Sequence, residues 1–327
     1  MRNRFSARLR EHWLELTVLL FFAIAMHLPL IGELYRNGVY LIPEKAGQFG
    51  DFVGGYIGTL FTLFSVLLIY WTLKHQRASS SEEKFEGRYF EMIKMHRDNA
   101  AELELEDASG RKIFVSLIGE LRAIYSVAKE TAASLDLEFS NKELMGICYT
   151  VLLFGTGPNS IRMLFGALSD VDEKFLKHVN GLLEYSSKWP EMQDDSQTGK
   201  YFFDGHQARL GHYYRHLYQT ICFVDKQEFS DEVKYDYVRT IRAQLTTHEQ
   251  AMLLVNSLAS VGRKWRNNGR NEPNDLIAKY RLVKNIPRGF FALGELDLEE
   301  LFDQGYFEWQ DAEATSSPKL PGVKLNG

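Results

Sequence analysis

Hydrophobic residues are spread unevenly along the chain, and the longest apolar run lies near its beginning. Residues 52–73 read FVGGYIGTLFTLFSVLLIYWTL and contain no charged side chain. A helix rises about 1.5 Å per residue, so this run reaches roughly 33 Å, enough to cross the ~30 Å hydrocarbon core of a bilayer. The alternative is a fully buried helix of a soluble domain. The pattern predicts a membrane span over residues 52–73.

A second apolar run precedes this one along the chain. Residues 14–31 read LELTVLLFFAIAMHLPLI and are apolar apart from Glu15 at the edge and His27. We predict a first membrane helix here. Such a helix can tolerate Pro29, because the proline lies near its far end. The alternative is the apolar region of a cleavable signal peptide, because basic residues precede the run.

Basic residues flank this pair of runs on both outer sides. The connection at residues 32–51 is poorer in them, with two basic residues against three acids. Because cytoplasmic flanks of membrane helices are rich in lysine and arginine, we predict an inner-membrane hairpin with both termini cytoplasmic and a membrane unit over residues 1–78. The flanking basic residues are Arg2, Arg4, Arg8 and Arg10 before the first run, and Lys74, Arg77, Lys84 and Arg88 after the second.

Three glycines lie at the start of the second predicted span. Gly54 and Gly58 form a G-x-x-x-G pair, with Gly55 beside the first. Small residues at this spacing let two membrane helices approach closely. The partner is either the first span of the same chain or the same helix of another copy. The second possibility predicts a homo-oligomer within the lipid bilayer.

From residue 79 the pattern becomes charged, amphipathic and helical. Ser80, Ser140 and Thr246 each begin a capping box, the signature of a helix start. Apolar residues recur at helical spacing, and no convincing alternating strand pattern is present. The predicted fold is all-α, with the two-helix transmembrane hairpin followed by an α-helical cytoplasmic domain over residues 79–310 and a disordered tail over residues 311–327.

Composition narrows the class of protein. A net charge of −5 and a pI near 6.0 argue against a domain built mainly to coat nucleic acid. Two cysteines, Cys148 and Cys222, give no disulfide framework and fit a reducing compartment. Residues 263–274, RKWRNNGRNEPN, form a basic, turn-rich segment, either a solvated loop or a loop that contacts an anion.

Histidine, tyrosine and arginine concentrate in residues 204–256. His212 and His216 are four residues apart and therefore share one helical face. A zincin-type protease needs glutamate directly after the first histidine, where Tyr213 stands, so that class is excluded. We predict neither a metal nor a cofactor. The plainest interpretation is that these side chains are hydrogen-bonded inside a helical bundle.

Two functional interpretations of the same segment stay open. Arg209 and His216 have six residues between them, which fits the Arg-x(4–6)-His arrangement of HEPN ribonucleases, although Leu210 stands where those enzymes favour a polar residue. The other interpretation is an anion-binding face, provided that the helices are neighbours. Its residues would be Tyr214, Arg215, Arg239, Arg242 and Gln244.

Short motifs occur in a fixed order along most of the chain: residues 50–58 with 74–76, then 211–219, then 242–256. In this combination the chain resembles the phage abortive infection family often called AbiC-like. Members of that family occur alone or as membrane effectors encoded beside a retron reverse transcriptase and its non-coding RNA, and the family has no established catalytic residues. The candidates for signal or partner binding are His206, Gly211, His212, Tyr214, Arg215, His216, Tyr218, Arg242, Gln244 and Asn256.

The resemblance implies a two-span inner-membrane effector of an anti-phage abortive infection system, acting alone or as the toxin of a retron. The expected partners are the lipid bilayer, further copies of the chain, and a reverse transcriptase with its RNA or DNA product as inhibitor or sensor. Neither enzymatic activity nor a dedicated small-molecule substrate is expected. The alternatives are a membrane-anchored ribonuclease that uses Arg209 and His216, and a non-toxic membrane scaffold or sensor.

Overall fold

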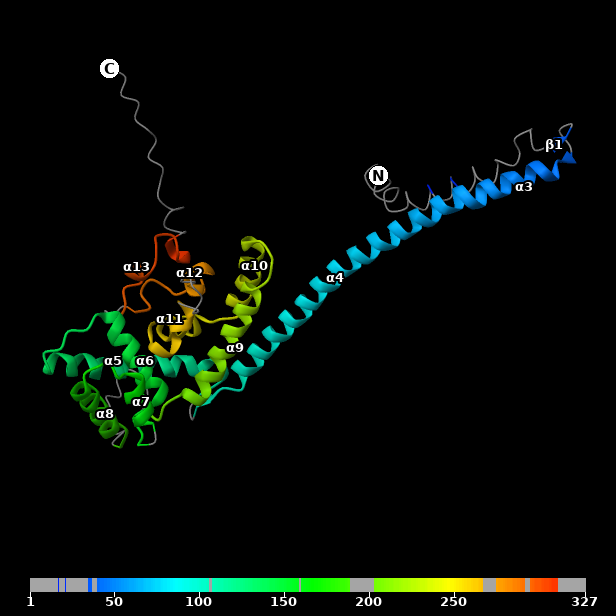
Figure 1. The fold of residues 1–327 in the computed structure, drawn as a ribbon. Coiled ribbons are helices and arrows are strands. Elements are labelled where there is room, and N and C mark those ends of the chain that lie inside the picture. Colours follow the sequence, from blue (N-terminus) through cyan, green and yellow to red (C-terminus); the bar gives the residue numbers. More distant parts are fainter. Residues whose placement is uncertain are drawn as a thin grey trace, which may run out of the picture. The chain divides into compact units, whose positions relative to one another are not determined.

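The computed structural model is mostly helical (Figure 1), which confirms the predicted all-α class. The chain divides into two compact units, Met1–Phe85 and Glu86–Gly327. The structure describes Thr17, Phe21 and residues 35–36, 40–105, 108–158, 160–188, 203–266, 275–291 and 295–310.

The first unit is dominated by one long helical segment. Its described elements are β1 (Tyr35–Arg36), which pairs with β2 (Tyr40–Leu41), then α3 (Pro43–Phe52), the π-helical turn η3 (Val53–Ile57) and α4 (Gly58–Ala101). Pro43 occupies the first position of α3, where its missing N–H costs nothing. The predicted second span is thus the middle of a longer helix, which begins inside the segment expected to be a loop.

The helix start predicted at Ser80 was wrong. Helix α4 passes through Ser80 without interruption and continues to Ala101. The physical reason is that residues 59–86 contain neither glycine nor proline to break the helix. A serine can therefore sit in the helix interior, and the capping-box pattern at this place has no structural meaning.

The apolar part of this helix is largely exposed among the residues that the structure describes. Among the described residues, the helical segment Pro43–Ala101 is the one that is long and apolar enough to cross a membrane, and none of its most apolar stretch is buried. Trp71, for example, is 74% exposed. A helix that is apolar on every side is unstable in water unless protein or lipid covers it. This helix is the one candidate span that the structure describes.

The first predicted span, residues 14–31, lies outside the described residues except for Thr17 and Phe21. Both of these are helical. The ring of Phe21 lies edge-on to that of Phe61 in α4, with the ring centroids 4.3 Å apart. The described residues show no clear two-helix hairpin, so the hairpin stays a prediction.

Threonine hydroxyls inside the candidate span are satisfied by the helix itself. Thr62 donates to the carbonyl oxygen of Gly58 at 2.9 Å, Thr72 donates to that of Leu68 at 2.8 Å, and Thr59 donates to that of Gly55. Transfer of a hydroxyl without a hydrogen-bond partner from water into hydrocarbon costs several kcal/mol of free energy. These internal hydrogen bonds make the threonines compatible with lipid.

The second unit is a bundle built around α11 (Thr247–Leu258), whose residues 251–257 are all buried. Helix α11 packs against α5, α6 and η6. The capping boxes predicted at Ser140 and Thr246 are both formed and begin α6 and α11. The other elements are β3 (Glu104–Leu105), β4 (Ala108–Ser109), η4 (Gly110–Lys112), α5 (Ile113–Ser134), α6 (Asn141–Phe154), α7 (Ile161–Ala167), α8 (Glu173–Lys188), α9 (Gln207–Asp225), α10 (Asp231–Arg242), the 3-10 helix η6 (Ser260–Trp265), α12 (Leu276–Lys279) and α13 (Leu298–Leu301).

The end of α6 and the start of α9 are held together backbone to backbone. Gly155 and Gly205 cross there with φ angles of +76° and +85°. A Cβ on Gly155 would lie 2.5 Å from the backbone of Asp204, and one on Gly205 would overlap the carbonyl of Phe154. The N–H of His206 donates to the carbonyl oxygen of Leu153 at 2.9 Å. Only glycine permits both the left-handed backbone and the close approach.

Replacing Gly205 by alanine should therefore lower the free energy of unfolding by about 2 kcal/mol or more, because the backbones would have to separate. The matched control is Gly181→Ala in α8, where an added Cβ meets nothing within 4 Å. That change should raise the free energy of unfolding by roughly 0.5–1 kcal/mol. Urea unfolding of the full chain in detergent, followed by circular dichroism, measures both. Equal midpoints for the two variants would contradict the crossing.

Candidate functional site

Helix α9 carries most of the residues that the sequence singled out, and its start is fixed by a buried pair. His206 is the N-cap residue, and its Nε2 lies 2.8 Å from Oε2 of Glu120 on α5. Both side chains are buried. Leu210 and Leu217 are buried farther along the helix. The helix is therefore held in a fixed rotation about its axis, and its other faces point to defined neighbours.

One face of α9 lines a cleft of about 620 Å³, completed by the end of α6 and by α11 and η6. We call it the α9 cleft. It brings together six of the ten predicted binding residues, from α9 and α11: Gly211, His212, Tyr214, Arg215, Tyr218 and Asn256. Its other lining residues were not among those ten, and they include Tyr149 of α6 and Lys264 and Trp265 of η6.

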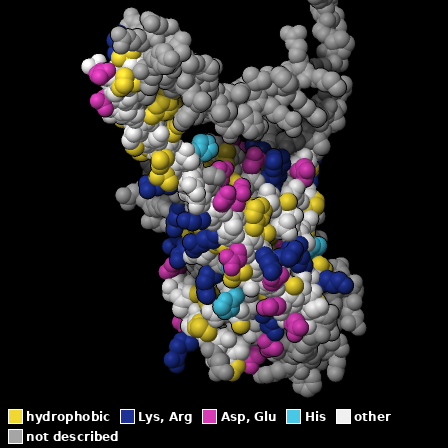
Figure 2. Space-filling view, turned by 90° about the vertical axis from the view of Figure 1, so that its right-hand side faces the viewer, with side chains coloured by type: hydrophobic (Ala, Val, Ile, Leu, Met, Phe, Trp, Pro, Cys, Tyr) yellow, Lys and Arg dark blue, Asp and Glu magenta, His cyan; other side chains and the backbone are white. Residues whose placement is uncertain are grey.

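The charge of the α9 cleft differs from that of the surface in general. On the face that Figure 2 shows, lysine and arginine are interspersed with aspartate and glutamate, as on an ordinary solvated surface. In the cleft, Arg215 and Lys264 are exposed, and none of the described residues that line it is acidic. His212 is exposed beside them. The cleft therefore favours an anion.

The floor of the cleft carries polar atoms without partners. The Nδ2 of Asn256 donates to the hydroxyl of Tyr149 at 2.7 Å, and both residues are buried. The Oδ1 of Asn256 and the hydroxyl of Tyr214 are buried and have no hydrogen-bond partner among the described residues. Burial raises the pKa of both tyrosines well above the usual range, so their hydroxyls stay neutral donors.

The opposite face of α9 points to a buried cluster. Tyr213 donates to Oε1 of Glu249 at 2.8 Å, and the ring of His96 lies 4.7 Å from that of Tyr213. His216 stacks parallel to His96, with the ring centroids 6.0 Å apart. Burial, then the charges of His216 and Arg111, lower the pKa of His96 to about 4. These groups belong to the interior of the bundle.

Arg209 and His216, the pair of the ribonuclease hypothesis, lie two turns apart on this second face. The Nε of Arg209 donates to the carbonyl oxygen of Glu104 at 2.8 Å, and its Nη1 lies 3.4 Å from Nδ1 of His206. His216 is instead beside His96, and burial lowers its pKa. The two side chains thus have separate neighbours, and neither lines the α9 cleft.

Two further predicted residues, Arg242 and Gln244, also lie away from the cleft. The Nη1 of Arg242 donates to the carbonyl oxygens of Tyr280 at 3.3 Å and Arg281 at 3.1 Å. Arg281 has a φ of +48°, so this guanidinium supports a strained turn. Gln244 is half-buried. The structure does not bring Arg242 together with Arg215, and Arg239 pairs with Asp236 at 3.2 Å.

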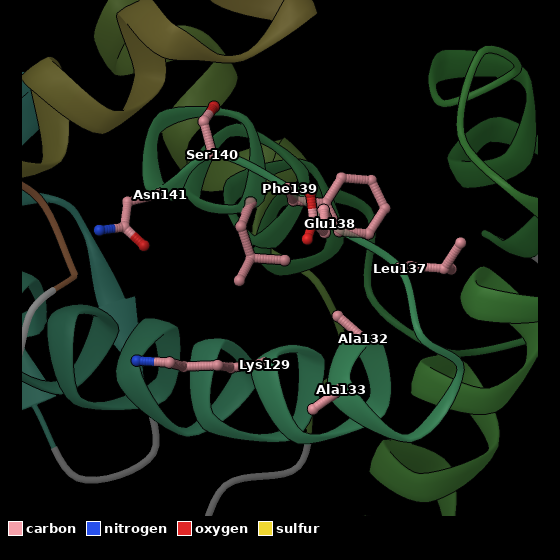
Figure 3. A pocket seen from close by; sticks show the side chains of 9 residues that line it. Lys129, Ala132, Ala133, Leu137, Glu138, Phe139, Ser140 and Asn141 are labelled. Atoms are coloured by element: carbon pink, nitrogen blue, oxygen red, sulfur yellow. The ribbon is translucent and has the colours of Figure 1, made fainter.

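A second pocket lies between α5 and the loop that leads into α6 (Figure 3). In this view, Lys129 lies on α5 in the lower part of the picture, and Ser140 and Asn141 lie above it at the start of α6. The fold uses their polar groups, because Ser140 caps α6 and the Oδ1 of Asn141 accepts from the Tyr125 hydroxyl at 3.2 Å. This pocket therefore presents no unused polar group comparable to those of the α9 cleft. No group of three potential ligands for a metal ion occurs among the described residues.

Comparison with known families identifies one part of the chain. Residues 205–291 match the family model described as Putative phage abortive infection protein. The matched segment runs from the glycine crossing through α9, α10, α11 and η6 and past α12, so it supplies most of the α9 cleft. Neither the curated proteins nor the solved structures contain a match to this chain.

The sequence did not indicate that Tyr149, Lys264 and Trp265 line the cleft, and the reason can be identified for each. Tyr149 lies in an apolar helical run that carries no signal of function. Lys264 and Trp265 belong to the basic segment at residues 263–274, for which anion contact was the alternative interpretation. Their proximity to α9 depends on the path of the chain after α11, which no local pattern encodes.

Acid should destabilise the bundle through His96. Its pKa is about 4 in the fold against 6.5 ordinarily, so the unfolded chain binds more protons between these values and stability falls as the pH drops from 6.5 to 4. The expected loss is about 3 kcal/mol. His96→Phe should flatten this dependence, whereas His178→Phe at an exposed position of α8 should not. Unfolding midpoints at pH 7.5 and 4.5 measure it, and an unchanged slope in His96→Phe would refute the assignment.

Proposed function

We propose that this chain is a membrane effector of an anti-phage abortive infection system, which perturbs the inner membrane of an infected cell and so causes death or growth arrest. The observation that carries the proposal is the presence, on one chain, of an uncovered apolar helix and a segment that matches the abortive infection family. The helix requires lipid, and the segment links the chain to phage defence. The helical unit lies in the cytoplasm in this proposal, because lysine and arginine follow the candidate span.

Self-association of the span would supply the damage to the membrane. Among the described residues, a Cβ added to Gly54 or Gly55 meets no atom within 4 Å, which supports the proposal that this part of the helix receives a second copy. Gly58 extends the same small-residue face by one turn. The described part of the chain also offers a route for control, because α4 contributes residues to both units without a break.

The helical unit would receive the infection signal or hold a restraining partner through the α9 cleft. The cleft has the properties of a binding site, since it is cationic and carries polar atoms without partners. For the partner we retain the proposal from the family resemblance, a retron reverse transcriptase with its RNA or DNA product. In this scheme the effector does not catalyse a reaction.

Substituting leucine for Gly54 and Gly58 together should abolish killing, because the two added side chains would keep neighbouring helices apart. The readouts are survival and membrane potential, followed with a voltage-sensitive dye during phage infection. Gly87→Leu is the matched control, since Gly87 lies exposed in the same helix beyond the candidate span. Membrane fractionation confirms insertion of each variant. Undiminished depolarisation in the double variant would contradict a role of these glycines in killing and would leave the helix as a membrane anchor only.

His216→Ala should leave killing intact. The ribonuclease alternative predicts the opposite, together with fragmentation of total RNA in dying cells. Circular dichroism of the purified variant shows whether the helical unit still folds, which matters because His216 stacks on His96. Fragmented RNA in the wild type that becomes intact in His216→Ala would replace the membrane mechanism by RNA cleavage.

A further inference from the structure

The chemistry of the α9 cleft restricts the kind of ligand that it can hold. Two cations reach it from different elements, Arg215 from α9 and Lys264 from η6. Among the residues that the structure describes, no carboxylate lines the cleft to neutralise them. A guanidinium and an ammonium on the walls of one cleft suit a phosphate group, to which arginine can donate two parallel hydrogen bonds. One end of the ligand is therefore anionic.

Aromatic side chains line the rest of the cleft. The rings of Tyr218 and Trp265 are perpendicular, at 89°, with their centroids 5.2 Å apart. Tyr149 and Tyr214 line the cleft as well. Tyr149, Tyr214 and Trp265 are each at most 6% exposed, whereas Tyr218 is half-buried. Tyr218 therefore offers the ring on which a flat, conjugated ligand can stack, and stacking of a base on an aromatic ring contributes about 1–3 kcal/mol in nucleic-acid complexes. The other part of the ligand is therefore planar and aromatic.

The partnerless atoms on the floor define a third requirement. Tyr214 and Asn256 are each 6% exposed, and each leaves one polar atom unused. A buried polar atom without a hydrogen bond costs roughly 1–3 kcal/mol. Both atoms are covered in the free protein, so a ligand with matching groups removes this cost only when the two side chains turn toward the cleft. The Oδ1 of Asn256 accepts from an N–H, and the Tyr214 hydroxyl can donate or accept. A nucleobase carries both kinds of group on its edge.

We propose that the α9 cleft binds a free nucleotide, with its base on the floor beside Asn256 and Tyr214 and its phosphate between Arg215 and Lys264. The volume of about 620 Å³ suits a ligand of this size. The inference deepens the proposed function, on which it rests, by naming the class of signal that the helical unit receives. In this proposal the nucleotide is a bound signal and is not converted chemically.

A nucleic acid strand fits the same surface less well. Binding of a strand needs a continuous basic groove that follows several phosphates. The cationic groups of the cleft are confined to one hollow, and the charges on the face in Figure 2 are mixed. The whole chain is also acidic, with a net charge of −5. These properties favour a single nucleotide.

Isothermal titration calorimetry on the full chain in phosphatidylcholine nanodiscs tests the proposal. The probes are AMP, GMP, CMP and UMP, with adenosine and ribose 5-phosphate as the two halves of a nucleotide. At least one monophosphate should bind with a micromolar Kd, and each half should bind at least about tenfold more weakly. The combined variant Arg215→Ala/Lys264→Ala should lose roughly tenfold or more in affinity. The control Lys177→Ala/Arg239→Ala removes two cations of exposed ion pairs elsewhere and should bind like the wild type.

Tyr214→Phe gives a second, independent test. It removes the unsatisfied hydroxyl and keeps the ring, so the free protein should melt at an equal or higher temperature while nucleotide affinity falls. A purely structural tyrosine would lower the melting temperature and leave affinity unchanged.

Four outcomes overturn the proposal: no monophosphate binds below millimolar concentration, the cleft variants bind as the wild type does, ribose 5-phosphate binds as tightly as the nucleotide, or a single-stranded oligonucleotide binds more tightly than every monophosphate. The titration involves neither phage nor membrane potential. Its failure would leave depolarisation during infection unaffected, and a lack of depolarisation would leave the titration unaffected.

Discussion

The crossing of two backbones at Gly155 and Gly205 determines where the functional segment lies. These glycines are fifty residues apart in sequence, with α7 and α8 between them, yet a Cβ on either would overlap the other chain segment. The N–H of His206 pairs with α6 at this point, and its ring pairs with Glu120 of α5. Three attachments within two residues fix both the position and the rotation of α9. That fixed rotation determines which side chains of α9 face the core and which line the cleft.

With its rotation fixed, α9 divides its polar side chains between two environments. Tyr213 and His216 enter a buried cluster with His96, where burial keeps the imidazoles neutral at physiological pH. Tyr214 and Arg215, their immediate sequence neighbours, line the cleft instead. Adjacent residues on a helix point about 100° apart, so a single dense motif supplies both the core and the lining of the α9 cleft. The density of histidine and tyrosine that made the segment conspicuous therefore has two separate causes.

Local patterns predicted the features of this chain that depend on local interactions. The apolar run at residues 52–73, the capping boxes at Ser140 and Thr246 and the all-α class all follow from neighbouring residues. The box at Ser80 failed because nothing breaks the helix around it, and a cap pattern needs an end to cap. The glycine crossing and the approach of η6 to α9 join distant residues, so their geometry could not be read from either sequence segment alone. The motif on α9 and α11 placed six binding candidates along the cleft, whereas nothing in the sequence around Tyr149 indicated that it lies there as well.

Two features of the described structure are unfavourable for a protein alone in water. The apolar helix exposes side chains such as Trp71 on all sides, and the cleft buries the Oδ1 of Asn256 and the hydroxyl of Tyr214 without partners. Both costs are appreciable fractions of the 5–15 kcal/mol by which folded domains are ordinarily stable. A bilayer removes the first cost and a ligand rich in hydrogen-bonding groups removes the second. Because each deficit is specific in chemistry, each favours a partner of defined chemistry, and these two deficits are the physical basis of the membrane effector and the cleft ligand that we propose.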